Sequence, residues 1–179
     1  MVLPIQIGVV ALIVGGFLVY LTVKGADETT MLTPPVGKIV PLVSKAGRFR
    51  IGVPNGVTAN RVGETVTLST KDKSLVVTAG PFGGGSLTAN SEAFVSSLKE
   101  TYSKVRVLGT QPQMVDGREA LATFGQALNA KKVRVRFVSV VVAARPRNYA
   151  INSFTRFDSD PSTILPTVNA IVNSFRVLD

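Results

Sequence analysis

The first apolar stretch of the chain is uninterrupted. Residues 4–23, PIQIGVVALIVGGFLVYLTV, contain no charged side chain. At about 1.5 Å per residue, a helix of this length spans roughly 30 Å, the thickness of a bilayer's hydrocarbon core. A signal peptide would need positive residues ahead of a shorter apolar run, and a buried core helix would show a polar stripe. The pattern therefore predicts one transmembrane helix within residues 1–23.

Small residues fall on one face of this predicted helix. Gly8, Ala11 and Gly15 have the spacing i, i+3, i+7, which lets a second helix approach closely. The alternative, that Gly and Ala are simply common in such helices, stays open. We expect this face to form a helix-packing interface.

Residues 24–46 carry three prolines and no sustained periodicity, so they are predicted to be a linker. Beyond them, residues 47–179 are long enough to form a core of their own.

Alternating apolar and polar positions dominate this domain and predict strands. Residues 65–69 and 74–79 flank a short charged turn, TKDK, and are expected to form a hairpin. A second hairpin is expected around Asp116-Gly117, because both positions of such a turn need positive φ. Further strands are predicted at residues 48–53, 131–144 and 148–157.

Two segments have helical periodicity instead. After the stretch GPFGGGSLTANSEAF, four apolar residues share one helical face, and Asn90 or Ser91 is expected to be the N-cap: Phe94, Leu98, Tyr102 and Val105. A second helix is expected to begin with Asp160 as N-cap and Pro161 near N1. Its apolar stripe is Leu165, Val168, Ile171, Val172 and Phe175. The predicted fold class is α+β, an antiparallel sheet of about six or seven strands flanked by two amphipathic helices and preceded by the transmembrane helix.

Several segments, in this order, resemble the PsbP-like family: GRFRIGVPNGV, SEAFVSSLKETYSKV, MVDGREALATFG and the closing NAIVNSFRV. The resemblance covers roughly residues 47–177 and implies an antiparallel sheet sandwiched by helices. It also implies an accessory or binding role rather than catalysis. Many bacterial members are lipoproteins, whereas here a predicted transmembrane helix replaces the lipidated cysteine.

Composition narrows the chemistry. The 179 residues include no Cys and no His, which removes thiol nucleophiles, the commonest general base and the usual zinc ligands. The glycine stretch before Asn90 lacks the Lys of a phosphate-binding P-loop and is expected to be a strand-to-helix connector. We therefore predict no enzyme, cofactor, metal or catalytic residue.

The formal net charge is +9, and a basic cluster stands out: Lys131, Lys132, Arg134, Arg136, Arg145 and Arg147. On a strand, Lys132, Arg134 and Arg136 would share one face, with Val133, Val135 and Phe137 on the other. One interpretation is a solvated strand face. The other is a patch for anionic lipid headgroups or a partner's carboxylates. Without a stacking motif, nucleic acid is not expected.

These features together favour a single-pass accessory subunit of the plasma membrane that helps assemble or stabilise a larger integral complex. The resemblance to small basic respiratory subunits suggests electron transport. The alternative is a membrane-tethered domain that binds a lipid or small amphiphile between sheet and helix. Lys24 and Lys38 after the apolar run favour a cytoplasmic domain, while the lipoprotein relatives favour the opposite side.

Overall fold

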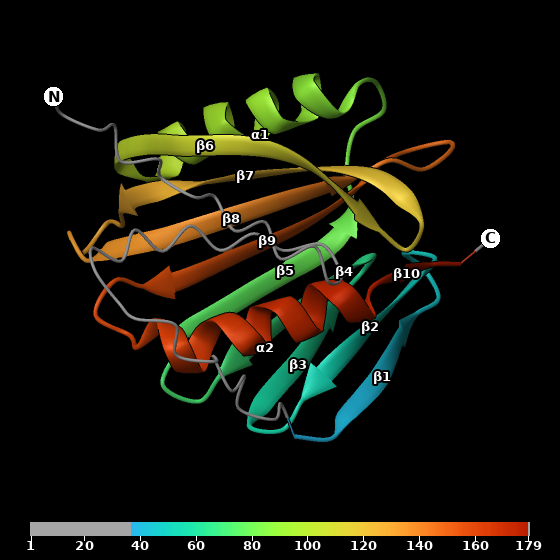
Figure 1. Cartoon of the computed structure of the whole chain (residues 1–179), viewed down its shortest axis with the longest axis horizontal. Coiled ribbons are helices and arrows are strands. Elements are labelled where there is room, and N and C mark those ends of the chain that lie inside the picture. Colours follow the sequence, from blue (N-terminus) through green and yellow to red (C-terminus); the bar gives the residue numbers. More distant parts are fainter. Residues whose placement is uncertain (1–36, 179) are drawn as a thin grey trace, which may run out of the picture.

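Residues 37–178 are the part of the chain described by the computed structural model, and their strands form two antiparallel sheets (Figure 1). The seven-stranded sheet has the order β3 (Val57–Val62), β4 (Thr65–Thr70), β5 (Leu75–Pro81), β9 (Tyr149–Arg156), β8 (Arg134–Val142), β7 (Arg118–Leu128) and β6 (Ser103–Val115). The three-stranded sheet has the order β1 (Ile39–Ser44), β2 (Phe49–Pro54) and β10 (Arg176–Val177). The α+β class is therefore confirmed, with three strands beyond the expected main sheet.

Both predicted hairpins are present. β4 pairs with β5 and β6 pairs with β7, each pair antiparallel. Asp116 and Gly117 have φ values of 55° and 67°, the left-handed geometry that such a tight turn demands. Along β6 the register with β7 shifts twice, between Ser103 and Arg106 and between Val107 and Gly109.

Strand β1 lies within residues 24–46, the segment predicted to be a linker. It pairs with β2 along its whole length, from Ile39 opposite Pro54 to Ser44 opposite Phe49. Because β1 contains a proline and is exposed at the sheet edge, it lacks the alternation of apolar and polar residues by which a strand is predicted. Strands β3 and β10 were likewise not predicted.

Helix α1 (Leu87–Thr101) begins earlier and ends earlier than expected. Its N-cap is Ser86, whose hydroxyl accepts a hydrogen bond from the Ala89 N–H at 3.1 Å, so the prediction of Asn90 or Ser91 is wrong. The helix ends at Thr101 because the chain extends directly into β6, and Val105 therefore lies in a strand.

Helix α2 (Pro161–Ser174) begins as predicted. Asp160 is the N-cap and accepts a hydrogen bond from the Ser162 N–H at 2.9 Å. Three residues of the expected stripe, Val168, Ile171 and Val172, are buried in the helix. Phe175 follows as the C-cap and is completely buried.

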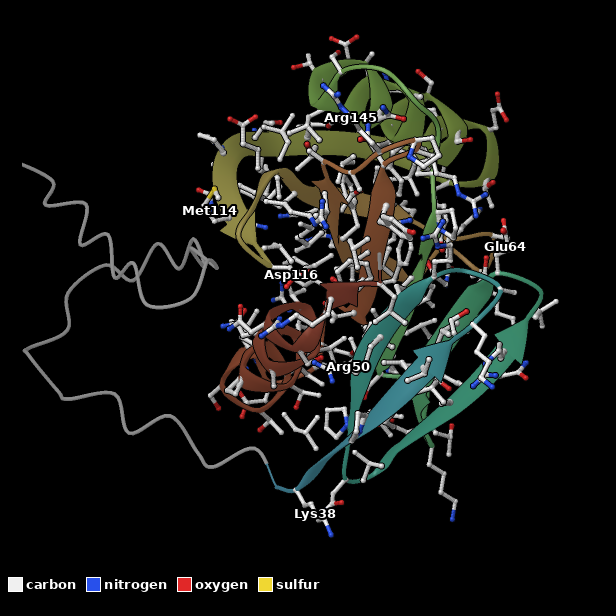
Figure 2. The ribbon with its side chains drawn as sticks, turned by 90° about the vertical axis from the view of Figure 1, so that its right-hand side faces the viewer. Lys38, Arg50, Glu64, Met114, Asp116 and Arg145 are labelled. Carbon is white, nitrogen blue, oxygen red and sulfur yellow. The ribbon has the colours of Figure 1, made fainter. Side chains whose placement is uncertain are left out.

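The seven-stranded sheet separates two cores, as the alternation along β8 shows. Val140 and Val142 belong to the larger core, which α2 and β2 complete. Val135 and Phe137 point the other way, into a smaller core under α1. Figure 2 shows the resulting layers, with α1 on one side of the sheet and α2 with the three-stranded sheet on the other.

An aromatic triad joins the two sheets inside the larger core. Phe49 of β2 lies 5.4 Å from Phe175 and 6.0 Å from Tyr149 of β9, measured between ring centroids, and Tyr149 lies 5.7 Å from Phe175. Phe49 and Phe175 are fully buried. Because the three rings come from β2, β9 and the end of α2, they couple the small sheet to the main one.

The predicted transmembrane helix and its packing residues Gly8, Ala11 and Gly15 lie outside the described residues. Within residues 37–178, neither helix has the length and apolar character needed to cross a membrane.

Candidate functional site

The basic cluster is divided between the two ends of β8. Lys131 and Lys132 lie in the turn before the strand, and Arg134 and Arg136 lie in its first residues. Arg145 and Arg147 lie in the loop after Val142, at the other end. At about 3.3 Å per residue, the strand separates the two groups by roughly 30 Å. The six residues therefore do not form one continuous patch.

Arg134 and Arg136 share a face of β8, as predicted, and both guanidinium groups lie over the ring of Phe157. The distances from guanidinium carbon to ring centroid are 4.8 Å for Arg134 and 4.2 Å for Arg136. Such cation–π contacts orient a guanidinium while leaving its N–H groups available to an acceptor. The sequence did not predict a role for Phe157, although this residue is the last of the strand predicted at residues 148–157.

The preceding turn is built by Asn129. Its side-chain oxygen accepts hydrogen bonds from the backbone N–H groups of Lys131 at 3.0 Å and Val133 at 2.9 Å. Lys132 has a φ of 58°, so it belongs to the turn and does not share the strand face predicted for it. Lys131 and Lys132 are both exposed at the tip.

At the other end of β8, Arg147 is engaged within the protein. It donates two hydrogen bonds to the Glu64 carboxylate, at 2.9 and 2.6 Å. These hydrogen bonds hold the pKa of Glu64 below its ordinary value. Figure 2 looks onto this end, where Arg145 and Glu64 are labelled. The pair links the β3–β4 turn to the β8–β9 loop, which is a structural role.

The glycine stretch connects β5 to α1, and the side chains of two asparagines hold its carbonyl groups. The Asn90 amide donates to the carbonyl oxygens of Gly84 and Ser86, at 3.0 and 2.9 Å. The Asn148 amide donates to the carbonyl oxygen of Gly85 at 3.0 Å. These contacts tie the loop to the segment between β8 and β9, and they support the interpretation of the stretch as a connector.

Exposed apolar side chains gather on β1, the free edge of the three-stranded sheet. Ile39, Val40 and Val43 are 37%, 52% and 39% exposed. An open hollow of about 350 Å³ adjoins them, lined by Val40, Pro41, Leu42, Val53, Pro54, Asn55, Gly56 and Val57. It lies beside the small sheet, not between sheet and helix, where the amphiphile-binding alternative would need it. Within residues 37–178, no cluster of Asp and Glu side chains is arranged to hold a metal ion.

Comparison with known proteins defines the class of fold. No protein-family model matches the sequence, and no curated protein matches it either. Solved structures do match, and they show that the chain has a PsbP-like α+β fold.

Three of these structures are representative. Cyanobacterial PsbP (CyanoP) from Synechocystis sp. PCC 6803 has a TM-score of 0.61 at 12% identity, over 80% of this chain and 95% of that chain. The Ran-binding protein Mog1p of Saccharomyces cerevisiae has a TM-score of 0.60 at 11% identity, over 80% and 97%. LpqN of Mycobacterium tuberculosis, involved in cell envelope biogenesis, has a TM-score of 0.54 at 13% identity, over 79% and 91%.

Proposed function

We propose that the protein is a non-catalytic, single-pass accessory subunit that docks on a larger integral membrane complex and stabilises or helps assemble it. The host complex is a respiratory electron-transfer assembly. The particular candidate is the association factor of the actinobacterial cytochrome bc–cytochrome oxidase supercomplex, which a small basic protein with one predicted membrane helix and this kind of domain resembles.

The observation that carries the proposal is the exposed apolar surface of β1. β1 is a free edge strand, with Ile39 and Val43 exposed on one face and Val40 on the other. It is the first described element after the predicted membrane helix. Apolar side chains grouped at an edge are typical of a contact surface. Their place in the chain puts this surface within reach of the extramembrane part of any subunit that the helix contacts.

The neighbours are compatible with such a role. One is described as binding Ran, and another as involved in cell envelope biogenesis. A fold that serves protein recognition in one setting suits an accessory subunit in another, although a shared fold alone does not transfer a partner.

A pull-down through a C-terminal tag in mild detergent tests the proposal. The full chain is expected to retain integral membrane subunits in stoichiometric amounts. The double variant Val40→Ser and Val43→Ser is expected to lose them, because it makes the β1 surface polar. Val62→Ser is the matched control, since Val62 is 71% exposed on β3, in the other sheet. Recovery of the wild-type chain alone would refute the proposal.

The hollow beside β1 has a mostly apolar lining that a small amphiphile could occupy, although it lies outside the sheet–helix layer where the amphiphile-binding alternative places its ligand. Native mass spectrometry of the full chain released from membranes separates the two functions. A retained lipid-sized mass that Leu42→Gln removes would favour ligand binding. The bare chain mass would favour the accessory-subunit role.

We place the domain on the cytoplasmic side, on the basis of Lys24 and Lys38 after the predicted helix. Protease added to intact cells should then leave the domain uncleaved, and protease added to inverted vesicles should cleave it. Cleavage on intact cells would put the domain outside.

A further inference from the structure

The chain enters the domain at one defined end of the seven-stranded sheet. Lys38 precedes Ile39, which pairs with Pro54, and the short turn after Pro54 leads to Val57, which pairs with Thr70. The antiparallel register puts the starts of β5, β6 and β8 and the ends of β7 and β9 at this same end. It lies at the left and lower left of Figure 1 and is termed the proximal end.

Basic side chains from four separate segments collect at the proximal end: Lys38, Lys71, Lys73, Lys104, Arg106, Lys131, Lys132, Arg134 and Arg136. All except Arg136 are exposed. Among residues 37–178, none of them forms an ion pair with a carboxylate. Sequence proximity pointed only to the four of them that surround the start of β8.

Most of the carboxylates at this end accept hydrogen bonds from neighbouring residues. Asp158 accepts hydrogen bonds from Arg156 at 3.0 and 2.5 Å. Asp160 caps α2, and Asp72 accepts from the N–H and hydroxyl of Ser74 at 3.1 and 2.8 Å. Among residues 37–178, the other acid at this end is Glu100, next to Lys99 in the last turn of α1. The nine cations outnumber these four carboxylates, so the described part of the proximal end has an excess of positive charge.

The opposite end is balanced differently. Arg147 is held by Glu64, and the Arg176 Nε lies 3.3 Å from an Asp116 carboxylate oxygen. Lys45, Arg61 and Arg145 are also exposed at the opposite end, so the proximal end is distinguished by its larger number of exposed cations and by its place where the chain enters the domain. Val133, 38% exposed between Lys132 and Arg134, adds an apolar side chain among the cations. Cations mixed with an apolar residue suit the boundary of a bilayer.

We propose that the proximal end rests on the headgroups of anionic phospholipids and so fixes the orientation of the domain on its membrane. From the proposed function, this inference takes only the predicted membrane helix that anchors the chain. At up to about 3.6 Å per residue, the fifteen residues from residue 23 to Lys38 keep the proximal end within about 54 Å of the bilayer. A polybasic surface at that range is drawn to an anionic leaflet, and salt weakens the attraction.

Because the chain contains no Cys, a single introduced cysteine can be labelled without labelling at any other position. The full chain carries Ala130→Cys, labelled with a polarity-sensitive fluorophore, in nanodiscs of phosphatidylcholine with or without phosphatidylglycerol. We expect a blue-shifted emission, quenched by headgroup-attached quenchers, only in the discs with phosphatidylglycerol, and its reversal by high salt. Ala46→Cys is the matched probe, exposed in the β1–β2 turn at the opposite end, and should not respond.

Charge removal tests the surface itself. Changing Lys131, Lys132 and Arg134 together to Gln should reduce docking in phosphatidylglycerol discs on the order of a hundredfold. Changing Lys45, Arg61 and Arg145 to Gln removes as many charges from exposed positions at the opposite end and should leave docking unchanged. Equal emission in both lipids, or equal losses in both variants, would overturn the inference.

The proposed membrane anchor and the proposed lipid-binding surface can be refuted independently of each other. Failure of the chain to enter phosphatidylcholine discs would refute the anchor. In that case the protein can still be tested for flotation with phosphatidylglycerol vesicles. Flotation that high salt abolishes would support lipid binding by the proximal end, and absence of flotation would contradict it. If the triple Gln variant lost integral subunits in the pull-down but kept its lipid response, the surface would belong to an acidic protein and the inference would be wrong.

Discussion

At the residue scale, Asp116 combines two tasks. Its φ of 55° places it in the left-handed region at the β6–β7 turn. Its carboxylate also accepts a hydrogen bond from the Val177 N–H at 2.9 Å and lies 3.3 Å from the Arg176 Nε. The sequence predicts the first task from the Asp-Gly pair. The second joins residues far apart in the chain and leaves no local signal.

Replacing Asp116 by Ala should lower the free energy of unfolding by about 1–3 kcal/mol, since it removes the acceptor and strains the turn. Asp116→Asn should lose clearly less, because Asn tolerates the left-handed region and keeps an oxygen acceptor. Urea denaturation of both variants measures the difference. Equal losses would show that the carboxylate charge, not the turn or the acceptor, matters.

Asp72 carries a pH dependence. A hydrogen bond from the Ser74 backbone N–H, with further ones from the hydroxyls of Thr70 and Ser74, lowers the pKa of Asp72 from 3.8 to about 2. The depressed pKa means that the carboxylate stabilises the folded state above pH 3.8 and loses this contribution as pH falls towards 2. NMR titration should give the low pKa, and Asp72→Asn should flatten the fall in stability in that window. A titration near 3.8 would contradict this.

At the scale of single elements, helix α1 depends on its cap. Ser86 accepts from Ala89, and Asn90 holds the carbonyls of the preceding loop. The periodicity of Phe94 and Leu98 predicts the helix correctly. It does not locate the first turn, because Leu87, Thr88 and Ala89 follow a glycine-rich stretch and add no apolar stripe of their own.

Replacing Ser86 by Ala should cost about 1 kcal/mol of stability, because one N–H of the first turn loses its acceptor. Ser86→Asp keeps an oxygen at this position and should retain most of the stability. Thermal unfolding followed by circular dichroism compares the two variants. An Asp variant as weak as the Ala variant would show that the hydroxyl does not act as a cap acceptor.

The elements that sequence reasoning missed share one property. β3 and β1 expose most of their side chains, and β10 has only two residues, neither of them buried, and pairs with β2, which is remote in sequence. Alternation is visible only where one face of a strand is buried. The six residues of the predicted basic cluster are close in sequence, but the length of β8 divides them into two groups, one at each end of the strand.

At the scale of the whole molecule, the aromatic triad decides whether the two sheets behave as one. Phe175 contacts Phe49 and Tyr149 across the larger core. Phe175→Ala should therefore cost about 3–5 kcal/mol. Phe175→Leu, which keeps more of the volume, should cost clearly less.

Hydrogen exchange distinguishes lost coupling from general weakening. In Phe175→Ala, the amides of β1 and β2 should lose protection before those of β7 and β8, because the small sheet is released from its support. Uniform loss of protection across both sheets would show that the triad contributes to global stability alone.

The outer strand β6 has a consequence for how the molecule meets its own copies. It is the longest strand within residues 37–178, its register shifts twice, and it carries Pro112. Bulges twist a strand out of plane, and proline offers no N–H for pairing. A second molecule therefore finds no regular ladder on β6 to which it could add a strand. If the protein is held in a membrane as proposed, its copies are concentrated in two dimensions, and the interrupted edge of β6 limits strand-to-strand association on this side of the sheet.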